Sequence, residues 1–392
     1  MNIVILIILL IISASLYLVI DYNGPKEILL TPDKISNIEC LRARELIVQE
    51  YDSQGNLWAS RGMILYCLNK SGNKFLKMAH IPTGFSFYWL NNFTLFRKLI
   101  NKPECLEATI TGDGHICALS AGFIWHSTSN ESRFHKTLKL RHYGFGVGRG
   151  ILSNGLLSVN GSHVYFGEYF RNSDRNDVLI YESRDNGKTW DVAFKYNPGI
   201  IRHIHALQKD PYTGRLWVCS GDNDPESIIA WSDDGFRNIN IIGKGNQRWR
   251  TAHLVFTEEA VYWGADTGST DLAGIYRWDK RTLTLSRVKA YDGAILYGAK
   301  LSSGLLIFST DREGFPNEKD NKTRLLVVDT ENKVSEIEIG SWKHWKKGYR
   351  YSFAMLRMPR NNGTNQAAVS VINQNEIPIG ELLLIHEKDL VV

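Results

Sequence analysis

A short segment near the middle of the chain carries an arginine and two histidines in an alternating pattern. In Arg202-His203-Ile204-His205, the two imidazoles share one face if the segment is a β-strand, because side chains alternate across a strand. His203 and His205 could then ligate a metal together with His253 or a carboxylate. They could also act as general base and acid in removing the proton next to a uronate carboxylate. In a third interpretation the histidines are structural: they form hydrogen bonds between neighbouring sheets, the blades, of a β-sheet fold.

Acidic and basic side chains elsewhere in the same region extend this set. Arg248 and Arg250 would also share a face of a strand, and they could hold a substrate carboxylate by paired hydrogen bonds. Glu168 and Asp222 could be the paired carboxylates of a glycosidase, with Tyr169 assisting. The sequence assigns no metal ligand set and no cofactor. The candidate catalytic residues are His203, His205, Tyr169, Glu168 and Asp222, and the candidate substrate-binding residues are Arg248, Arg250, Asp266 and Arg312.

The elements that must position these residues are short β-type runs separated by Gly, Asn, Asp and Ser turns. One apolar run, which mostly ends in a small residue, recurs at 57–60, 116–120, 164–167, 216–220, 261–264, 305–309 and 367–371. A second, weaker series follows it. Seven units, each on the order of 45 to 60 residues, predict one β-propeller of seven four-stranded blades. A pair of β-sandwiches is the alternative, and the recurring small residue disfavours it. The candidate residues follow or precede the recurring runs, where a propeller has its functional face.

One turn in this pattern is distinctive. Residues Ser183 to Trp190 read Ser-x-Asp-x-Gly-x-Thr-Trp. Ser183 and Asp185 can accept hydrogen bonds from the N–H groups of the turn, and Gly187 can supply a positive φ. The octapeptide resembles the Asp-box of sialidases and other β-propeller proteins. A degraded copy begins at Ser127, and a copy shortened by one residue begins at Ser232. The resemblance implies a propeller with the Asp-box on the outer hairpin of a blade, away from the active centre.

The resemblance to sialidases does not extend to catalysis. Sialidases carry an Arg-Ile-Pro signature, and the nearest string here is His80-Ile81-Pro82, which lacks the arginine. Classical sialidase activity is therefore not expected. The His and Arg set is more similar in kind to that of propeller-type polysaccharide lyases, which use His, Tyr and Arg on the channel face. We expect a hydrolase or lyase acting on a glycan, with an acidic polysaccharide favoured. The alternative is a noncatalytic propeller that binds glycan or protein, such as an assembly factor.

The charge of the chain is consistent with an anionic glycan as partner. The formal net charge is +5, and it is spread along the chain rather than gathered in runs. Nucleic-acid-binding proteins concentrate basic residues on one face or along one helix. We therefore expect no nucleic-acid partner.

The N-terminus predicts a membrane segment. Residues Ile3 to Ile20 form an almost unbroken apolar run of about 18 residues, just long enough to cross a bilayer. Ser13-Ala14-Ser15 could be cleaved as in a signal peptide, which would give a secreted protein. However, the run continues beyond these residues and no basic residue precedes it. We expect a retained single-pass anchor at 1–22, a linker at 23–40, and a propeller at 41–392 that lies outside the cytoplasm.

Two further expectations concern the ends of the chain and the cysteines. A closed propeller usually joins both ends of its chain in one blade, which would place residues after Tyr22 beside those near Leu390. Cys40 and Cys105 lie in loop-like sequence and could pair in an oxidising compartment. The other cysteines lie in apolar strand patterns and are expected in the core; they are Cys67, Cys117 and Cys219.

Overall fold

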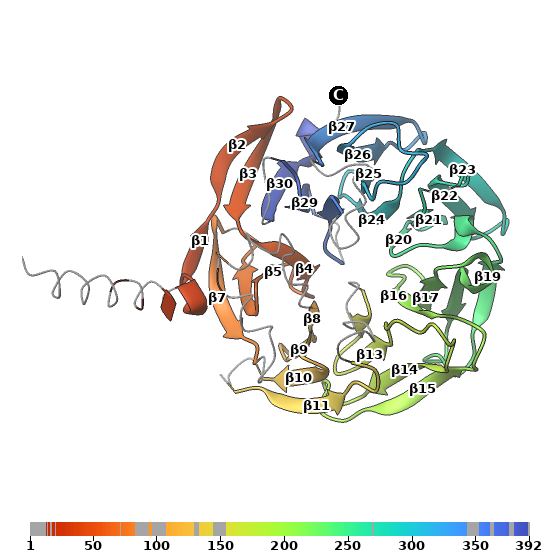
Figure 1. Ribbon diagram of the computed structural model, residues 1–392, viewed down its shortest axis with the longest axis horizontal. Coiled ribbons are helices and arrows are strands. Elements are labelled where there is room, and N and C mark those ends of the chain that lie inside the picture. The colour runs from red at the N-terminus through yellow and green to blue at the C-terminus, as the bar shows by residue number, and fades with distance from the viewer. Residues whose placement is uncertain are drawn as a thin grey trace, which may run out of the picture.

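A computed structural model of the protein describes residues 21–70, 72–82, 107–128, 133–143, 154–268, 270–342, 353–360, 364–375 and 380–390, with isolated positions between 13 and 19 and at 93 and 95. Across these ranges, the strands form seven antiparallel sheets arranged as a ring (Figure 1). Five sheets have four strands and two have five. The predicted all-β propeller of seven blades is confirmed.

Five consecutive blades follow a simple meander from the innermost strand to the outermost. Blade 2 contains β8 (Glu107–Ile110), β9 (Ile116–Ser120), β10 (Phe123–Ser127) and β11 (His135–Lys139). Blade 3 contains β12 (Leu156–Ser158), β13 (Val164–Gly167), β14 (Val178–Ser183) and β15 (Asp191–Tyr196). Blade 4 contains β16 (His203–Lys209), β17 (Leu216–Gly221), β18 (Ile228–Ser232) and β19 (Asn240–Lys244). Blade 5 contains β20 (Leu254–Phe256), β21 (Ala260–Gly264), β22 (Gly274–Asp279) and β23 (Leu285–Ala290). Blade 6 contains β24 (Ile295–Lys300), β25 (Leu306–Thr310), β26 (Lys322–Val328) and β27 (Val334–Ser341).

The N-terminal part of the chain adds one strand to blade 1 and two strands to blade 7. Blade 1 contains β4 (Ile47–Tyr51), β5 (Leu57–Arg61), β6 (Ile64–Leu68) and β7 (Lys74–His80), with β1 (Glu27–Leu29) added outside β7. Blade 7 contains β28 (Met355–Arg357), β29 (Gln366–Ile372) and β30 (Glu381–His386), followed outward by β3 (Ile38–Arg44) and β2 (Thr31–Ile35). The short 3-10 turns η2 (Asp224–Glu226), η3 (Gln247–Trp249) and η4 (Glu387–Asp389) complete these elements.

The two ends of the chain meet in blade 7, as predicted. Strand β3 pairs antiparallel with β30, and Cys40 lies opposite Ile385. Part of the segment expected to be a linker, 23–40, is therefore strand: it carries β1, β2 and the start of β3. The β2–β3 hairpin turns at Ser36 and Asn37, which both have positive φ, as the tight turn between two twisted strands requires.

The recurring apolar run is the second strand of each blade, not the innermost one. It corresponds to β5, β9, β13, β17, β21, β25 and β29. Innermost strands precede these runs and carry buried polar groups, such as Gln49 and Glu50 on β4 and Glu107 on β8. These polar residues interrupt the apolar pattern, which is why the second strand gives the stronger signal. Among the described residues the hydrophobic core is divided into seven clusters, and most of them join two adjacent blades.

A buried ionic network joins blades 1, 2 and 7 at the ring closure. The guanidinium of Arg360 contacts Glu50 (Nη2–Oε2 2.9 Å) and Glu107 (Nη1–Oε1 3.2 Å). Glu50 also accepts hydrogen bonds from the side chain of Thr109 and the backbone N–H of Ile110. All three charged residues are almost fully buried. A single arginine therefore contacts two buried carboxylates where the ring closes.

The Ser183–Trp190 turn connects the third and fourth strands of blade 3, at the outer side of the ring. Asp185 accepts hydrogen bonds from the backbone N–H of Thr189 (2.9 Å) and from the hydroxyl of Ser183 (2.8 Å). The N–H of Gly187 donates to the Ser183 hydroxyl at 2.8 Å. Gly187 has φ +89°, and a Cβ there would lie 2.3 Å from the Cys117 sulfur of blade 2. The predicted turn chemistry and its outer position are confirmed.

The related turn from Ser232 has the full length, contrary to the prediction that it is shortened by one residue. Phe236 N–H donates to the Ser232 hydroxyl, and Asn238 N–H donates to Asp234, with the same residue spacings as in the first turn. Phe236 takes the place of the glycine at φ +66°, which concealed the match in the sequence. The degraded copy from Ser127 lies partly outside the described residues.

The N-terminal and cysteine predictions have different outcomes. Most of Ile3 to Ile20 lies outside the described residues. No helix within the described residues is long and apolar enough to cross a membrane.

Cys40, Cys67, Cys117 and Cys219 are buried free thiols, which puts the last three in the core as expected. Cys105 lies outside the described ranges. The free thiol of Cys40 does not support the suggested pairing, because strand β3 places this residue within the ring closure.

Candidate functional site

Two histidines and one aspartate of blade 4 converge at the end of the ring where the innermost strands begin. His203 and His205 lie on β16, and Asp222 directly follows β17. The Nε2 atoms of the two histidines are 3.2 Å apart, and Asp222 Oδ1 lies 3.4 Å from the first and 3.3 Å from the second. The predicted sharing of one face by the histidines is confirmed. We call these three residues the histidine–aspartate cluster.

The local backbone of blade 4 creates room for this cluster. The pairing of β16 with β17 shifts register between Ile204 and Ala206, so His205 occupies a bulge. A Cβ at Gly221, the last residue of β17, would lie 2.5 Å from the His205 ring. Glycine at this position therefore allows the imidazole to approach the strand closely.

Backbone carbonyls fix the tautomers of both histidines. His203 Nδ1 lies 2.9 Å from the carbonyl oxygen of Phe170, and His205 Nδ1 lies 3.3 Å from that of Thr251. A carbonyl can only accept a hydrogen bond, so each Nδ1 carries the proton. In neutral imidazoles the two Nε2 atoms are then acceptors, and they face the carboxylate oxygen of Asp222, which is also an acceptor.

Three acceptor atoms that converge without a proton between them require a positive charge. Protonation of one imidazole would supply it, but burial lowers the pKa of His203 and disfavours that solution. A divalent cation is the second solution. Ligands at about 2.1 Å from a metal lie roughly 3.0 to 3.4 Å apart in octahedral or tetrahedral geometry, which matches the observed separations. The carbonyl partners on Nδ1 are also typical of metal-binding histidines.

Arginines and a second aspartate surround the cluster. Arg202 Nη1 lies 2.5 Å from Asp222 Oδ2, and Arg250 Nη2 lies 3.6 Å from Asp222 Oδ1. Arg250 Nε also lies 3.2 Å from Asp266. Both guanidinium groups favour the ionised form of the Asp222 carboxylate. The carboxylate of Asp222 is therefore ionised.

Tyr169 lies over the cluster. Its ring centroid is 4.0 Å from that of His203, and the two ring planes are tilted by 33°. Burial raises the pKa of Tyr169 above its ordinary value, so its hydroxyl keeps its proton at neutral pH. Of the nine predicted site residues, the structure thus brings together His203, His205, Asp222, Tyr169, Arg250 and Asp266.

Glu168 and Arg312 make other contacts. Glu168 accepts hydrogen bonds from Arg141, at 2.9 and 2.6 Å, and from the backbone N–H of Leu179, all within the packing of blades 2 and 3. Arg312 is fully buried, and its guanidinium lies 3.2 Å from Asp292 and 3.4 Å from Asp320. Both side chains are engaged in holding loops rather than in contacts with the cluster.

Arg248 and His253 also differ from expectation. Arg248 lies in the 3-10 turn η3, so it does not alternate with Arg250 on a strand, and its buried Nε has no hydrogen-bond partner in the described part of the chain. His253 accepts a hydrogen bond from the backbone N–H of Gly298 at 3.3 Å. Burial lowers the pKa of His253 to about 3, so it is a neutral core residue and does not join the cluster.

Sequence reasoning missed Glu313, which lies three residues beyond the end of β25. Burial, followed by the negative charge of Asp266, raises the pKa of Glu313 to about 8. The only sequence signal was positional: polar residues follow the second strand at Asp222, at Asp266 and at Asp311-Arg312.

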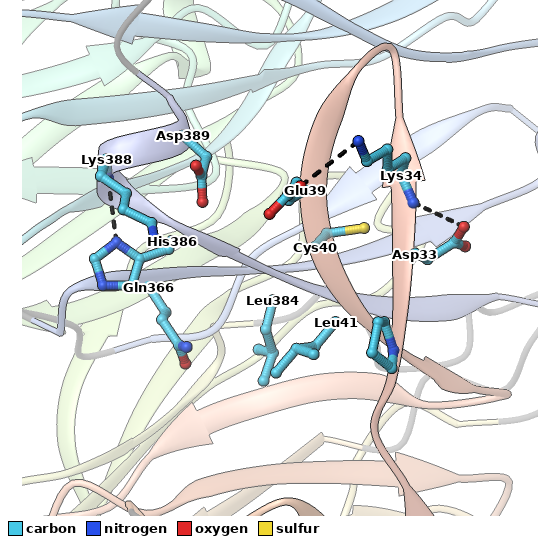
Figure 2. A pocket seen from close by; sticks show the side chains of 11 residues that line it. Asp33, Lys34, Glu39, Cys40, Leu41, Gln366, Leu384, His386, Lys388 and Asp389 are labelled. Atoms are coloured by element: carbon cyan, nitrogen blue, oxygen red, sulfur yellow. Dashed lines mark hydrogen bonds and ion pairs between the residues drawn. The ribbon is translucent and has the colours of Figure 1, made fainter.

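A separate hollow of about 630 Å³ lies at the outer side of blade 7. Figure 2 shows Leu41 and Leu384 at its base, with Lys34, Glu39 and Lys388 around it. None of the predicted site residues lines this hollow. It therefore contributes nothing to the histidine–aspartate cluster.

The fold and the cluster define a seven-bladed β-propeller with a polar site at one end of the ring. No family model matches the chain, and no curated protein matches its sequence. Among solved structures, the chain is similar to oligogalacturonate lyase from Vibrio parahaemolyticus, with a TM-score of 0.57, 10% identity, and coverage of 92% of this chain and 98% of that one.

Two other solved structures are similar. An oligogalacturonate lyase in complex with manganese has a TM-score of 0.54 at 10% identity, covering 93% of this chain and 99% of that one. The extracellular domain of a putative hybrid two-component system from B. thetaiotaomicron has a TM-score of 0.52 at 11% identity, covering 90% of this chain and 39% of that one. At these identities the similarity establishes the fold.

Proposed function

We propose that the protein cleaves an acidic oligosaccharide at the histidine–aspartate cluster, by a lyase reaction that a divalent cation assists. The observation that carries this proposal is the convergence of three acceptor atoms, from His203, His205 and Asp222, beside two arginines. The similar fold of two oligogalacturonate lyases, one of them described in complex with manganese, favours a uronate substrate. The kinship with Asp-box proteins suggested by the sequence rests on the two turns of blades 3 and 4.

The side chains suit an elimination next to a carboxylate. Arg202 and Arg250 keep part of their guanidinium surface exposed, so each can offer further N–H groups to a uronate carboxylate. A cation at the cluster would withdraw charge from that carboxylate and so acidify the adjacent C–H. Tyr169 keeps its hydroxyl proton and can donate it to the departing glycosidic oxygen.

A hydrolase would use the same carboxylates in another way. It would need a water molecule and a protonated carboxyl beside the scissile bond. Asp222 does not fit the acid role, because its contacts with Arg202 and Arg250 favour the ionised carboxylate. Glu313, whose pKa is raised to about 8, meets the requirement for a protonated carboxyl, so the preference for the lyase rests on the converging acceptors and the two arginines beside them.

The proposal predicts which substrates yield product. The full chain should form unsaturated uronate ends from oligogalacturonate in the presence of Mn²⁺, read as new ultraviolet absorbance. Removal of the metal with a chelator should abolish the signal, and a neutral oligosaccharide of equal length should give none. New reducing ends without unsaturation would instead indicate hydrolysis. Binding of oligogalacturonate without any product would support the alternative of a noncatalytic glycan-binding propeller.

We also propose that the N-terminal apolar run anchors the propeller outside the cytoplasm. The segment that follows this run is held firmly on blade 1: Asp21 pairs with Arg61 at 2.8 Å, and the carbonyl of Pro25 accepts from Tyr66. Arg61 ends β5, just as Asp222 follows β17, so the anchor would join the ring at the same end as the cluster. Added protease should digest the propeller on intact cells. Protection until the cells are lysed would contradict this topology.

A further inference from the structure

The loop after β25 holds Glu313 in a fixed position. The backbone N–H groups of Glu313 and Gly314 donate to the carboxylate of Glu318, at 2.9 and 3.0 Å. Glu318 is almost fully buried. The preceding residue, Arg312, exchanges two backbone hydrogen bonds of 3.0 Å with Ala354 of blade 7. The backbone around Glu313 is therefore held on both sides, and its side chain is free to serve another purpose.

This loop packs against the loop that carries Asp266. A Cβ at Gly268 would lie 2.7 Å from the ring of Phe315, so the two loops touch at a point where only glycine fits. Asp266 in turn contacts Arg250, and Arg250 approaches Asp222 of the cluster. The loop that carries Glu313 thus touches the loop that carries Asp266, one of the charged residues around the cluster.

The surroundings of Glu313 are those of a carboxyl group available for chemistry. The charges that act on it belong to Asp266, Arg250, Glu318 and Asp222. In the described part of the chain its half-buried carboxyl accepts no hydrogen bond, unlike Glu168 and Glu318, which are saturated by donors. A structural carboxylate in a folded protein is normally satisfied by donors. Glu313 differs from these structural carboxylates in this respect.

We propose that Glu313 is the proton-transfer residue of this site, the carboxylate that removes the proton from the carbon next to the substrate's carboxylate group. The inference rests on the proposed lyase function. The C–H bond breaks and its proton moves to a Glu313 oxygen. The electron pair forms the carbon–carbon double bond, the glycosidic C–O bond breaks, and the departing oxygen takes the Tyr169 proton. Glu313 then releases its proton to water and Tyr169 takes one from water, so both side chains return to their starting protonation states.

The acid–base properties of Glu313 agree with this role. A carboxylate with a pKa of about 8 is a much stronger base than an ordinary glutamate. Burial is the main cause and Asp266 the next; Glu318 and Asp222 act in the same direction, Arg250 opposes them, and the neighbouring Asp311 carries a raised pKa as well. Because the deprotonated form is the base, the rate should rise with pH and level off above the pKa of Glu313.

The test compares Glu313→Gln with the wild-type full chain on oligogalacturonate and Mn²⁺. We expect kcat to fall at least about 100-fold. The KM and the Mn²⁺ affinity should stay within about twofold, and the rise of rate with pH should disappear. The matched control is Glu331→Gln, on an exposed turn of blade 6, which should leave all four quantities unchanged.

The possible outcomes separate the two proposals. A Glu313→Gln variant that keeps wild-type kcat and pH profile overturns the role of Glu313 and leaves the lyase proposal standing. If the Mn²⁺ affinity falls by the same factor as kcat, or if the melting temperature falls markedly, Glu313 is a structural residue and the inference is overturned. If the wild-type chain forms no unsaturated product, the lyase proposal fails and this inference fails with it.

Discussion

The variant His203→Ala is expected to lower the affinity of the protein for Mn²⁺ by at least about 100-fold and to abolish formation of unsaturated product. His203 Nε2 is one of three converging acceptors, and its Nδ1 is held by the Phe170 carbonyl. Changes even in groups that only orient metal ligands typically cost 10- to 100-fold in affinity, so loss of a ligand should cost more. Equilibrium titration of Mn²⁺ into the full-length variant measures the effect.

The control is His163→Ala, because His163 is exposed on the turn between β12 and β13. This variant should bind Mn²⁺ as the wild type does. The melting temperature of the His203→Ala protein without metal should stay close to that of the wild type, since removing one acceptor relieves the crowding of acceptors. Unchanged Mn²⁺ affinity in His203→Ala would contradict the assignment of the cluster as a cation site.

The variant Arg360→Ala is expected to destabilise the fold by about 3–5 kcal/mol, the usual cost of removing one partner of a buried ion pair. Arg360 pairs with Glu50 and Glu107 where blades 1, 2 and 7 meet. Without it, two buried carboxylates remain uncompensated in the ring closure. Urea unfolding at neutral pH measures the loss, and Arg237→Ala, on an exposed turn, is the control.

The pH dependence of the Arg360→Ala variant provides a second signature. Burial raises the pKa values of Glu50 and Glu107, and Arg360 partly offsets that rise. Removing Arg360 raises both pKa values further, so the folded state binds protons more tightly than the unfolded state. The stability deficit should therefore shrink as the pH falls through the raised pKa values and grow as the pH rises. A deficit that is independent of pH, or one below about 1 kcal/mol, would contradict this account of the ring closure.

The overall fold was predictable because its signals are local. Turn chemistry from Ser183 to Trp190, the recurring second strands and the alternation of His203 with His205 each depend on residues close together in the sequence. Backbone sterics and side-chain periodicity determine such features directly. The closure of the ring by residues 38–44 follows from the same repeat, because the last blade needs an outer strand.

The details of the site were less predictable because they depend on loops and on distant partners. Arg248 and Arg250 looked like alternating strand residues, but Arg248 belongs to the turn η3 and Arg250 directly follows it, so neither lies on a strand. Glu168 and Asp222 looked alike in sequence, yet Arg141 saturates the first and the histidines surround the second. Only the packing of blade 5 against blade 6 brings Glu313 near Asp266. No local pattern encodes these contacts.

The most direct test of the account is crystallographic. Crystals of the protein grown with Mn²⁺ should show an anomalous scattering peak at about 2.1–2.2 Å from His203 Nε2, His205 Nε2 and an Asp222 carboxylate oxygen, the distance expected for such ligands. The remaining coordination positions should face the open end of the ring, next to Arg202 and Arg250. A Mn²⁺-soaked crystal without an anomalous peak between these three side chains, at a pH where both imidazoles are neutral, would contradict the cation site and the lyase proposal built on it.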